Sequence, residues 1–213
     1  MNVIGNAIEE LYRIFHILNY DKFGNSLPEP VITIQKTKGN VLGHFTKDRV
    51  WIDKNHVEDE QTSYYEINVD PRWFCDRTSQ EVVETLLHEM CHYKNRVDNI
   101  NDCNGNNHNK KFKRLAESVG LLVERGKSVG YGYTSLSDDL KAYIDKYVKP
   151  DDKAFEYFRS THVIGDRDSG SKVRKKSIFT YTCPDCGQVA KAKRDVVIKC
   201  GFCNVQMEIE NDD

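Results

Sequence analysis

The sequence lacks any uninterrupted apolar run approaching the roughly 20 residues that a membrane-spanning helix needs. Its opening residues, MNVIGNAIEELYRIF, also lack the basic start, apolar core and small-residue cleavage site of a secretory signal. We therefore expect a cytoplasmic protein that has no membrane partner. We also expect no nucleotide cofactor.

Disulfide pairing cannot account for all the cysteines, because their number, seven, is odd. Four of them form two C-x-x-C units: Cys183, Cys186, Cys200 and Cys203. In a reducing compartment such units favour a metal over disulfides. The other three cysteines are expected to be free thiols.

The composition is that of a globular protein, with 38% hydrophobic and 30% charged residues. A chain of 213 residues is long enough for one ordinary domain and a small appended module. The net charge of -2 hides a basic segment over residues 172–199. Such a segment attracts polyanions, although many charged runs are merely solvated surfaces.

Hydrophobic periodicity predicts an α+β fold. A helical pattern opens the chain, and β-branched and aromatic stretches follow at 31–35, 41–53 and 64–70, which indicates a small, mostly antiparallel sheet. Thr78 and Glu81 form a capping-box signature ahead of the apolar pattern Val83, Leu86, Leu87 and Met90. We expect helices over 3–19, 79–95, 109–119 and 135–148.

The domain organisation follows from this pattern. Residues 1–150 are expected to form the main domain, and residues 151–176 a helical and charged linker. Residues 177–213 contain both C-x-x-C units, thirteen residues apart, with strand-like stretches around them. This spacing predicts a zinc ribbon in which four thiolates close the coordination shell of a structural zinc.

A candidate catalytic motif lies on the helix predicted over 79–95. His88 and His92 are one helical turn apart, so both imidazoles can bind one tetrahedral zinc, and Glu89 lies beside them. In this HExxH pattern zinc activates water and polarises a carbonyl, while Glu89 acts as general base. The apolar stripe of the same helix points about 150–170° away from the histidines, which leaves them free to face a cleft.

A catalytic zinc needs a third protein ligand, and the residues offer three candidates. His108 follows a polar loop just ahead of the next predicted helix. Asp98 lies where one class of zinc peptidases places its last ligand, but Asn95 stands where that class needs glycine. Glu117 lies on a helix whose neighbours point to the core.

The order of opening helix, small sheet, HEMCH helix and G-x-x-H-x-x-x-F (Gly105, His108, Phe112) resembles the SprT family of zinc metallopeptidases, to which Spartan belongs. The resemblance covers roughly the first 135 residues. It implies a zincin-like catalytic domain in which His88, His92 and His108 bind zinc and Glu89 is the general base. Asp98 and Glu117 would then be surface residues.

The same resemblance extends to the C-terminal module, because some SprT-like proteins end in a zinc ribbon and Spartan acts on proteins crosslinked to DNA. It implies that basic residues on and before the ribbon contact nucleic acid, although a plain solvated surface is an equal alternative. These residues are Arg174, Lys175, Lys176, Lys191, Lys193 and Arg194.

The sequence thus predicts a zinc-dependent endopeptidase, with one catalytic and one structural Zn²⁺, that cleaves proteins bound or crosslinked to DNA. One alternative is a non-enzymatic nucleic-acid-binding protein in which both zinc ions are structural. Another is a peptidase dedicated to one regulatory protein.

Overall fold

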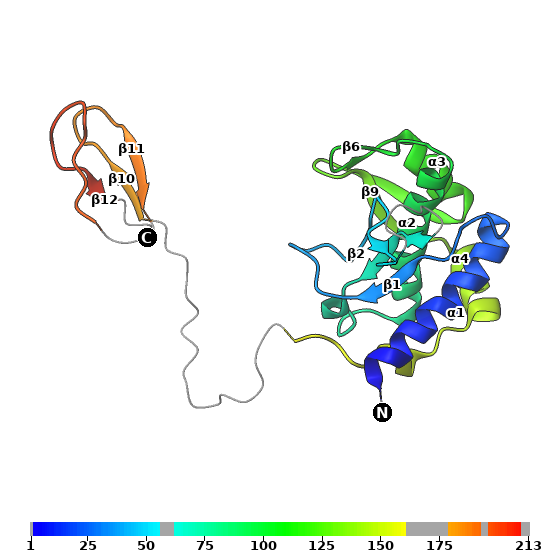
Figure 1. Cartoon of the computed structure of the whole chain (residues 1–213). Helices are drawn as coiled ribbons and strands as arrows, with labels where there is room; N and C mark the ends of the chain where they lie inside the picture. The colour runs from blue at the N-terminus through cyan, green and yellow to red at the C-terminus, as the bar shows by residue number, and fades with distance from the viewer. Residues whose placement is uncertain (1, 56–61, 161–178, 193–195, 210–213) are drawn as a thin grey trace. The chain divides into compact units, whose positions relative to one another are not determined.

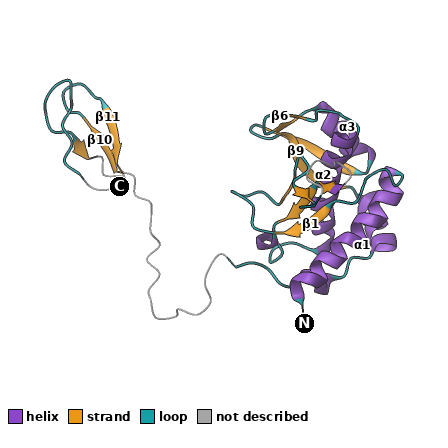
Figure 2. Ribbon diagram, in the orientation of Figure 1, coloured by secondary structure: helices purple, strands orange, loops and turns teal. Residues whose placement is uncertain are grey.

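A computed structural model describes residues 2–55, 62–160, 179–192 and 196–209. The chain divides into two compact units, Met1–His162 and Val163–Asp213 (Figure 1). The first unit combines helices with short strands, and the second consists of strands and turns (Figure 2). The expected α+β fold is confirmed.

The first helix, α1 (Val3–Phe23), is one turn longer than predicted. It ends at Gly24, whose left-handed backbone suits a residue without a Cβ. The sequence pattern suggested an end near Asn19, but this side chain is buried and hydrogen-bonds both the backbone N–H and the carbonyl of Leu27. Asn19 therefore fixes the chain reversal after the helix without ending the helix.

The central sheet has the order β1-β5-β2, with β1 (Val31–Ile34), β5 (Glu66–Val69) and β2 (Gly43–Phe45). β1 and β5 are parallel, whereas β2 runs antiparallel to β5 and forms one edge, so the sheet is mixed. A separate hairpin joins β3 (Trp51–Ile52) to β4 (Ser63–Tyr64). The predicted strand-rich stretch 41–53 therefore contributes to two sheets.

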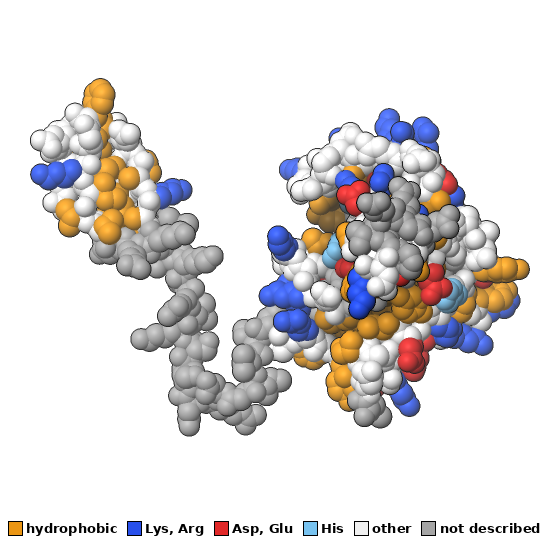
Figure 3. All heavy atoms as spheres, in the orientation of Figure 1, with side chains coloured by type: hydrophobic (Ala, Val, Ile, Leu, Met, Phe, Trp, Pro, Cys, Tyr) orange, Lys and Arg blue, Asp and Glu red, His pale blue; other side chains and the backbone are white. Residues whose placement is uncertain are grey.

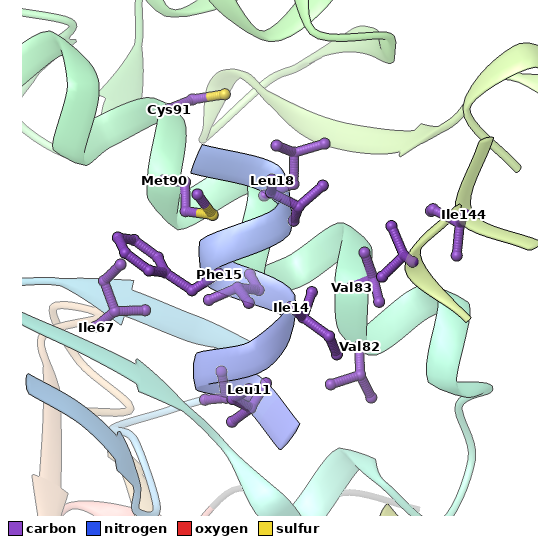
Figure 4. Close-up of a cluster of buried hydrophobic side chains, with 14 of the residues drawn as sticks. Leu11, Ile14, Phe15, Leu18, Ile67, Val82, Val83, Met90, Cys91 and Ile144 are labelled. Carbon is purple, nitrogen blue, oxygen red and sulfur yellow. The ribbon is translucent and has the colours of Figure 1, made fainter. Parts of the chain in front are cut away.

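Helix α2 (Ser79–Val97) lies in the interior of the first unit (Figure 1). The predicted capping box is present, because Thr78 and Glu81 bond to each other's backbone N–H. The predicted apolar stripe is fully buried, and it packs against α1 and Ile67 of the sheet (Figure 4). Burial of large aliphatic side chains stabilises a fold by about 1.5–3 kcal/mol each, so this stripe fixes the rotation of α2.

Beyond α2 the chain forms a second sheet, of order β6-β7-β9-β8, that was not predicted. The loop expected between the two helices contains the short hairpin β6 (Cys103–Asn104) and β7 (Asn107–His108). Helix α3 (Lys110–Ser118) confirms the third predicted helix. The hairpin of β8 (Leu121–Gly126) and β9 (Gly130–Leu136) follows it, and β9 also pairs with β7.

The last helical segment of the first unit is α4 (Asp138–Tyr143), which continues as the π-helical turn η3 (Ile144–Val148). Short 3-10 turns are η2 (Pro71–Trp73) and η4 (Asp152–Phe155). Phe155 is buried against Phe74, so the core continues past residue 150, where we expected a linker to begin. The remainder of that expected linker lies outside the described residues. Across the described helices, none combines the length and the apolar character needed to cross a membrane.

The second unit has its own small core of Tyr181, Met207 and two of the four cysteines. Its sheet has the order β11-β10-β12, with β10 (Phe179–Thr182), β11 (Val189–Ala192) and β12 (Glu208–Ile209). Of the strand-like stretches expected around the cysteines, residues 196–200 form only one bridge, Lys199 to Gln206. This arrangement fits the expected zinc ribbon.

A buried carboxylate holds the chain that leads into β2. Asp70 accepts hydrogen bonds from the backbone N–H and hydroxyl of Thr37 at 2.7 and 2.8 Å, and its backbone N–H donates to the carbonyl of Leu42. Arg72 forms an ion pair with the same carboxylate at 2.6 Å. Burial alone would raise the pKa of Asp70, but the bonds from Arg72 and Thr37 lower that pKa to about 2.

We therefore expect Asp70 to make stability depend on pH. A pKa of about 2, below the ordinary 3.8, means that the stabilisation is complete above pH 4 and disappears as the pH falls towards 2. The difference in unfolding free energy between wild type and Asp70→Asn should shrink over that range, by about 2 kcal/mol. Urea unfolding at several pH values measures it, and a pH-independent difference would contradict this account.

Candidate metal centre

Three imidazoles converge in the first unit. His88 and His92 come from adjacent turns of α2, and His108 comes from the end of β7. The Nε2 atom of His108 lies 3.2 Å from that of His88 and 2.9 Å from that of His92. Ligand nitrogens around a tetrahedral zinc are separated by about 3.3 Å, so the three atoms fit a zinc ion.

The other ring nitrogen of each histidine has its own partner. Nδ1 of His92 lies 2.7 Å from Asp102, and Nδ1 of His108 lies 3.1 Å from the carbonyl oxygen of Val129. Nδ1 of His88 lies 3.0 Å from the hydroxyl of Thr134. Because each partner can accept a proton from Nδ1, the neutral form of each ring can direct the lone pair of Nε2 at the shared point.

Phe112 forms the floor beneath the three rings. Its ring centroid lies 4.7 Å from that of His88 and 4.6 Å from those of His92 and His108, and its side chain is fully buried. The aromatic residue of the G-x-x-H-x-x-x-F motif therefore limits the rotation of all three imidazoles. It also closes the metal centre from the side of α3.

Glu89 is buried beside the histidines, with an exposed fraction of 6%. Burial raises the pKa of Glu89 to about 7, which suits a group that takes and returns a proton near neutral pH. The edge strand β2 passes close to it: a Cβ built on Gly43 would lie 3.3 Å from the carboxylate of Glu89 and 2.8 Å from the carbonyl of Asn68. Glycine at this position lets the strand approach the site.

Burial also acts on the histidines. It lowers the pKa of His88 far below the ordinary value and lowers the pKa of His108, so both rings are neutral, as metal ligands must be. Burial alone would lower the pKa of His92 as well, but its hydrogen bond with Asp102 raises that pKa to about 10. Metal binding at Nε2 of His92 therefore releases a proton.

The two other candidates for the third ligand lie elsewhere. Asp98 caps the C-terminus of α2 and forms an exposed ion pair with Lys94. Glu117 is exposed and pairs with Lys113. Of the three candidates, only His108, the residue that the family resemblance implied, joins His88 and His92.

The structure adds Asp102, Thr134 and the carbonyl of Val129, which our sequence analysis did not single out. Nothing local distinguishes them, since Asp102 lies in a polar loop and the other two lie in an unpredicted hairpin. The sequence feature that comes nearest to indicating these groups is the glycine pattern at the start of β9. Gly130 has a φ of +60°, and a Cβ there would lie 2.3 Å from the carbonyl oxygen of His108.

Two other cysteines lie close to the site. Cys91 is fully buried in the core, and burial raises the pKa of its thiol, so it is an unreactive packing group. Cys103 is half-buried, and its Sγ lies within 4.8 Å of a ring nitrogen of His92 and of a carboxylate oxygen of Asp102.

The second unit brings its four cysteines together. All four sulfur atoms lie within 4.8 Å of one another, and those of Cys186 and Cys200 are 3.7 Å apart. Thiolates around a tetrahedral zinc are separated by about 3.8 Å, so this cluster can hold zinc. Backbone N–H groups of Cys203 and Phe202 lower the pKa of Cys200 to about 7, which favours the thiolate that a metal requires.

Of the six basic residues expected to contact nucleic acid, the structure describes only Lys191, which is exposed on β11. Arg174, Lys175, Lys176, Lys193 and Arg194 lie outside the described residues.

A second basic surface lies on the first unit. Residues 110–127 contain six basic residues and two acidic ones, and Figure 3 shows Lys and Arg side chains over the region of α3. The charged groups of Lys113 and Arg125 lie 5.7 and 5.8 Å from the ring centroid of Tyr131. We call residues 110–127 the α3 surface. It begins two residues after His108.

The position of His108 can be tested at Gly132. A Cβ there would lie 2.6 Å from Nδ1 of His108, so we expect Gly132→Ala to displace the imidazole and weaken zinc binding at the histidine cluster by about 10- to 100-fold. Chelator competition measures the change. Gly201→Ala is the matched control, because a methyl group there meets no atom within 4 Å. Unchanged affinity in Gly132→Ala would show that His108 is not held as described.

Comparison with known proteins gives one result that bears on this site. Neither the curated proteins nor the solved structures contained a match to the chain. The model of the SprT-like family matches residues 11–129, which is more than half of the chain. That span runs from α1 through α2, His108 and α3, and so includes the three histidines, Glu89 and their aromatic floor. The chain therefore belongs to the SprT-like family.

Proposed function

We propose that this protein is a zinc-dependent endopeptidase that cleaves proteins bound or crosslinked to DNA. The observation that carries the proposal is the convergence of three Nε2 atoms beside a buried glutamate. His88, His92 and His108 would hold the catalytic zinc, and Cys183, Cys186, Cys200 and Cys203 a structural one. The proposed total is two zinc ions per chain.

The protein's own residues divide the chemistry between them. Bound zinc would supply Lewis acidity towards water and towards the scissile carbonyl. Glu89 would take a proton from the attacking water and deliver it to the leaving amine, a role that its pKa of about 7 supports. β2 is an edge strand beside Glu89, and those backbone groups on its outer edge that do not bond to Glu89 could pair with an extended peptide.

The variant Glu89→Gln tests the proposed role of Glu89 as general base. The amide keeps the shape of the side chain but cannot accept a proton, so we expect folded protein with two zinc ions and at least about 100-fold slower proteolysis. Zinc content and cleavage of an unstructured protein such as casein are the measurements. Glu9→Gln on the exposed side of α1 is the matched control. Wild-type protein with two zinc ions and no cleavage of any tested protein would favour a purely nucleic-acid-binding protein or a dedicated substrate.

The proposed DNA partner is supported by charge. The α3 surface carries an excess of four positive charges, as six basic against two acidic residues, and it begins next to a zinc ligand. Lys191 adds an exposed positive charge on the ribbon. DNA held at the α3 surface would bring a protein attached to that DNA close to the metal centre.

Reversal of positive charges on the α3 surface tests the proposed DNA partner. We expect DNA to accelerate cleavage of a DNA-binding protein, and we expect Lys110→Glu with Arg114→Glu to abolish the acceleration while cleavage without DNA is unchanged. Assays with single-stranded DNA, duplex DNA and none identify the preferred form. Lys191→Glu tests the ribbon, and Lys146→Glu on η3 is the control. Equal rates with and without DNA would remove DNA from the proposal.

A further inference from the structure

Beyond the three imidazoles, a series of hydrogen bonds between partly or fully buried side chains leads away from His88. Glu84 lies one turn before His88 on α2, and its exposed fraction is 7%. Thr134 donates its hydroxyl proton to one oxygen of Glu84. Arg77 donates to the other oxygen at 2.7 Å. A buried carboxylate with a paired cation and a hydroxyl donor is the kind of arrangement that fixes hydrogen-bond directions.

The direction of the hydrogen bond between Thr134 and Glu84 matters because a threonine hydroxyl has only one proton. Since that proton points to Glu84, Thr134 can only accept at its contact with Nδ1 of His88, 3.0 Å away. His88 must then carry its proton on Nδ1, which leaves the Nε2 lone pair for the metal. If the hydroxyl turned round and donated to Nδ1, the proton would lie on Nε2 and would block metal binding.

We propose that Glu84 and Thr134 are positioning residues that fix His88 in its metal-binding tautomer. Arg77 supports them: it pairs with Glu84, and it also donates to the hydroxyl of Thr85 at 2.5 Å, so its side chain is held against α2. Nδ1 of His92 has a carboxylate as its direct partner, and Nδ1 of His108 has a backbone carbonyl. A carboxylate and a backbone carbonyl can only accept, so His88 alone depends on a group that can also donate.

Peptidase activity by itself would be a poor test. Arg77, Glu84 and Thr134 line a cavity of about 860 Å³, together with Leu42 next to β2. A substrate side chain that entered this cavity would also be affected by changes at these residues. The inference rests on the proposed zinc site but not on the proposed activity, so the test is made without substrate.

The test compares three variants of the full-length protein. Thr134→Val keeps the shape of the side chain and removes the hydroxyl, Glu84→Gln removes the charge that orients it, and Thr134→Ser restores a hydroxyl. Ser135→Ala, the exposed neighbour on β9, is the matched control. Chelator competition gives the zinc affinity of the histidine cluster, with the cysteine cluster of the same chain as internal reference. Nitrogen NMR of metal-free protein gives the tautomer of His88.

We expect Thr134→Val to weaken zinc binding at the histidine cluster by about 10- to 100-fold. Glu84→Gln should weaken it in the same direction, and both variants should show protonation of His88 at Nε2, while Thr134→Ser and Ser135→Ala resemble wild type. A purely structural role would lower stability without moving the tautomer. If Thr134→Val does not fold, Glu84→Gln decides. Folded variants with wild-type zinc affinity and tautomer would overturn the inference, whereas a wild type that binds no zinc at the histidines would instead overturn the proposed function.

Discussion

The rotation of α2 about its own axis is the constraint on which the rest of the first unit depends. Val83, Leu86, Leu87 and Met90 are fully buried against α1 and the sheet, so the helix cannot turn without exposing them to water. Successive residues are about 100° apart on a helix. Burial of the stripe therefore directs His88 and His92 to the other side of α2. There α3 and the second sheet provide Phe112 and His108.

Because α2 is covered on both sides, each polar side chain that it buries needs a hydrogen-bond partner. α2 buries Glu84, Glu89 and Asn95, each of which would be costly without a partner. Arg77 and Thr134 bond to Glu84, the backbone of Phe45 to Glu89, and Asp102 to Asn95. Within the described part of the chain no buried side-chain nitrogen or oxygen lacks a partner. Two of these partners also contact imidazoles of the candidate metal centre, Thr134 at His88 and Asp102 at His92.

The two units position their candidate metal ligands in different ways. In the first, a large core positions three histidines, and a zinc ion held by three protein ligands would keep a fourth position for an exchangeable ligand, as catalytic zinc sites require. In the second, a small core is built around the cysteines themselves, since two of them are among its buried members. Its four thiolates would complete the coordination of a zinc ion, which would then contribute directly to the stability of this unit.

The sequence by itself determined the features that depend on neighbouring residues: the capping box at Thr78, the stripe of α2, the spacing of His88 and His92, and the paired cysteines. It also indicated the family, which the match over residues 11–129 confirms. Spacing left His108, Asp98 and Glu117 open as the third ligand, and the family resemblance favoured His108. Only the tertiary structure shows that His108 lies beside the other two histidines, and which groups contact each Nδ1. These groups come from β9 and from loops whose local sequence fits many conformations. Their positions depend on long-range pairing, such as that of β7 with β9, and spacing along the chain does not encode such pairing.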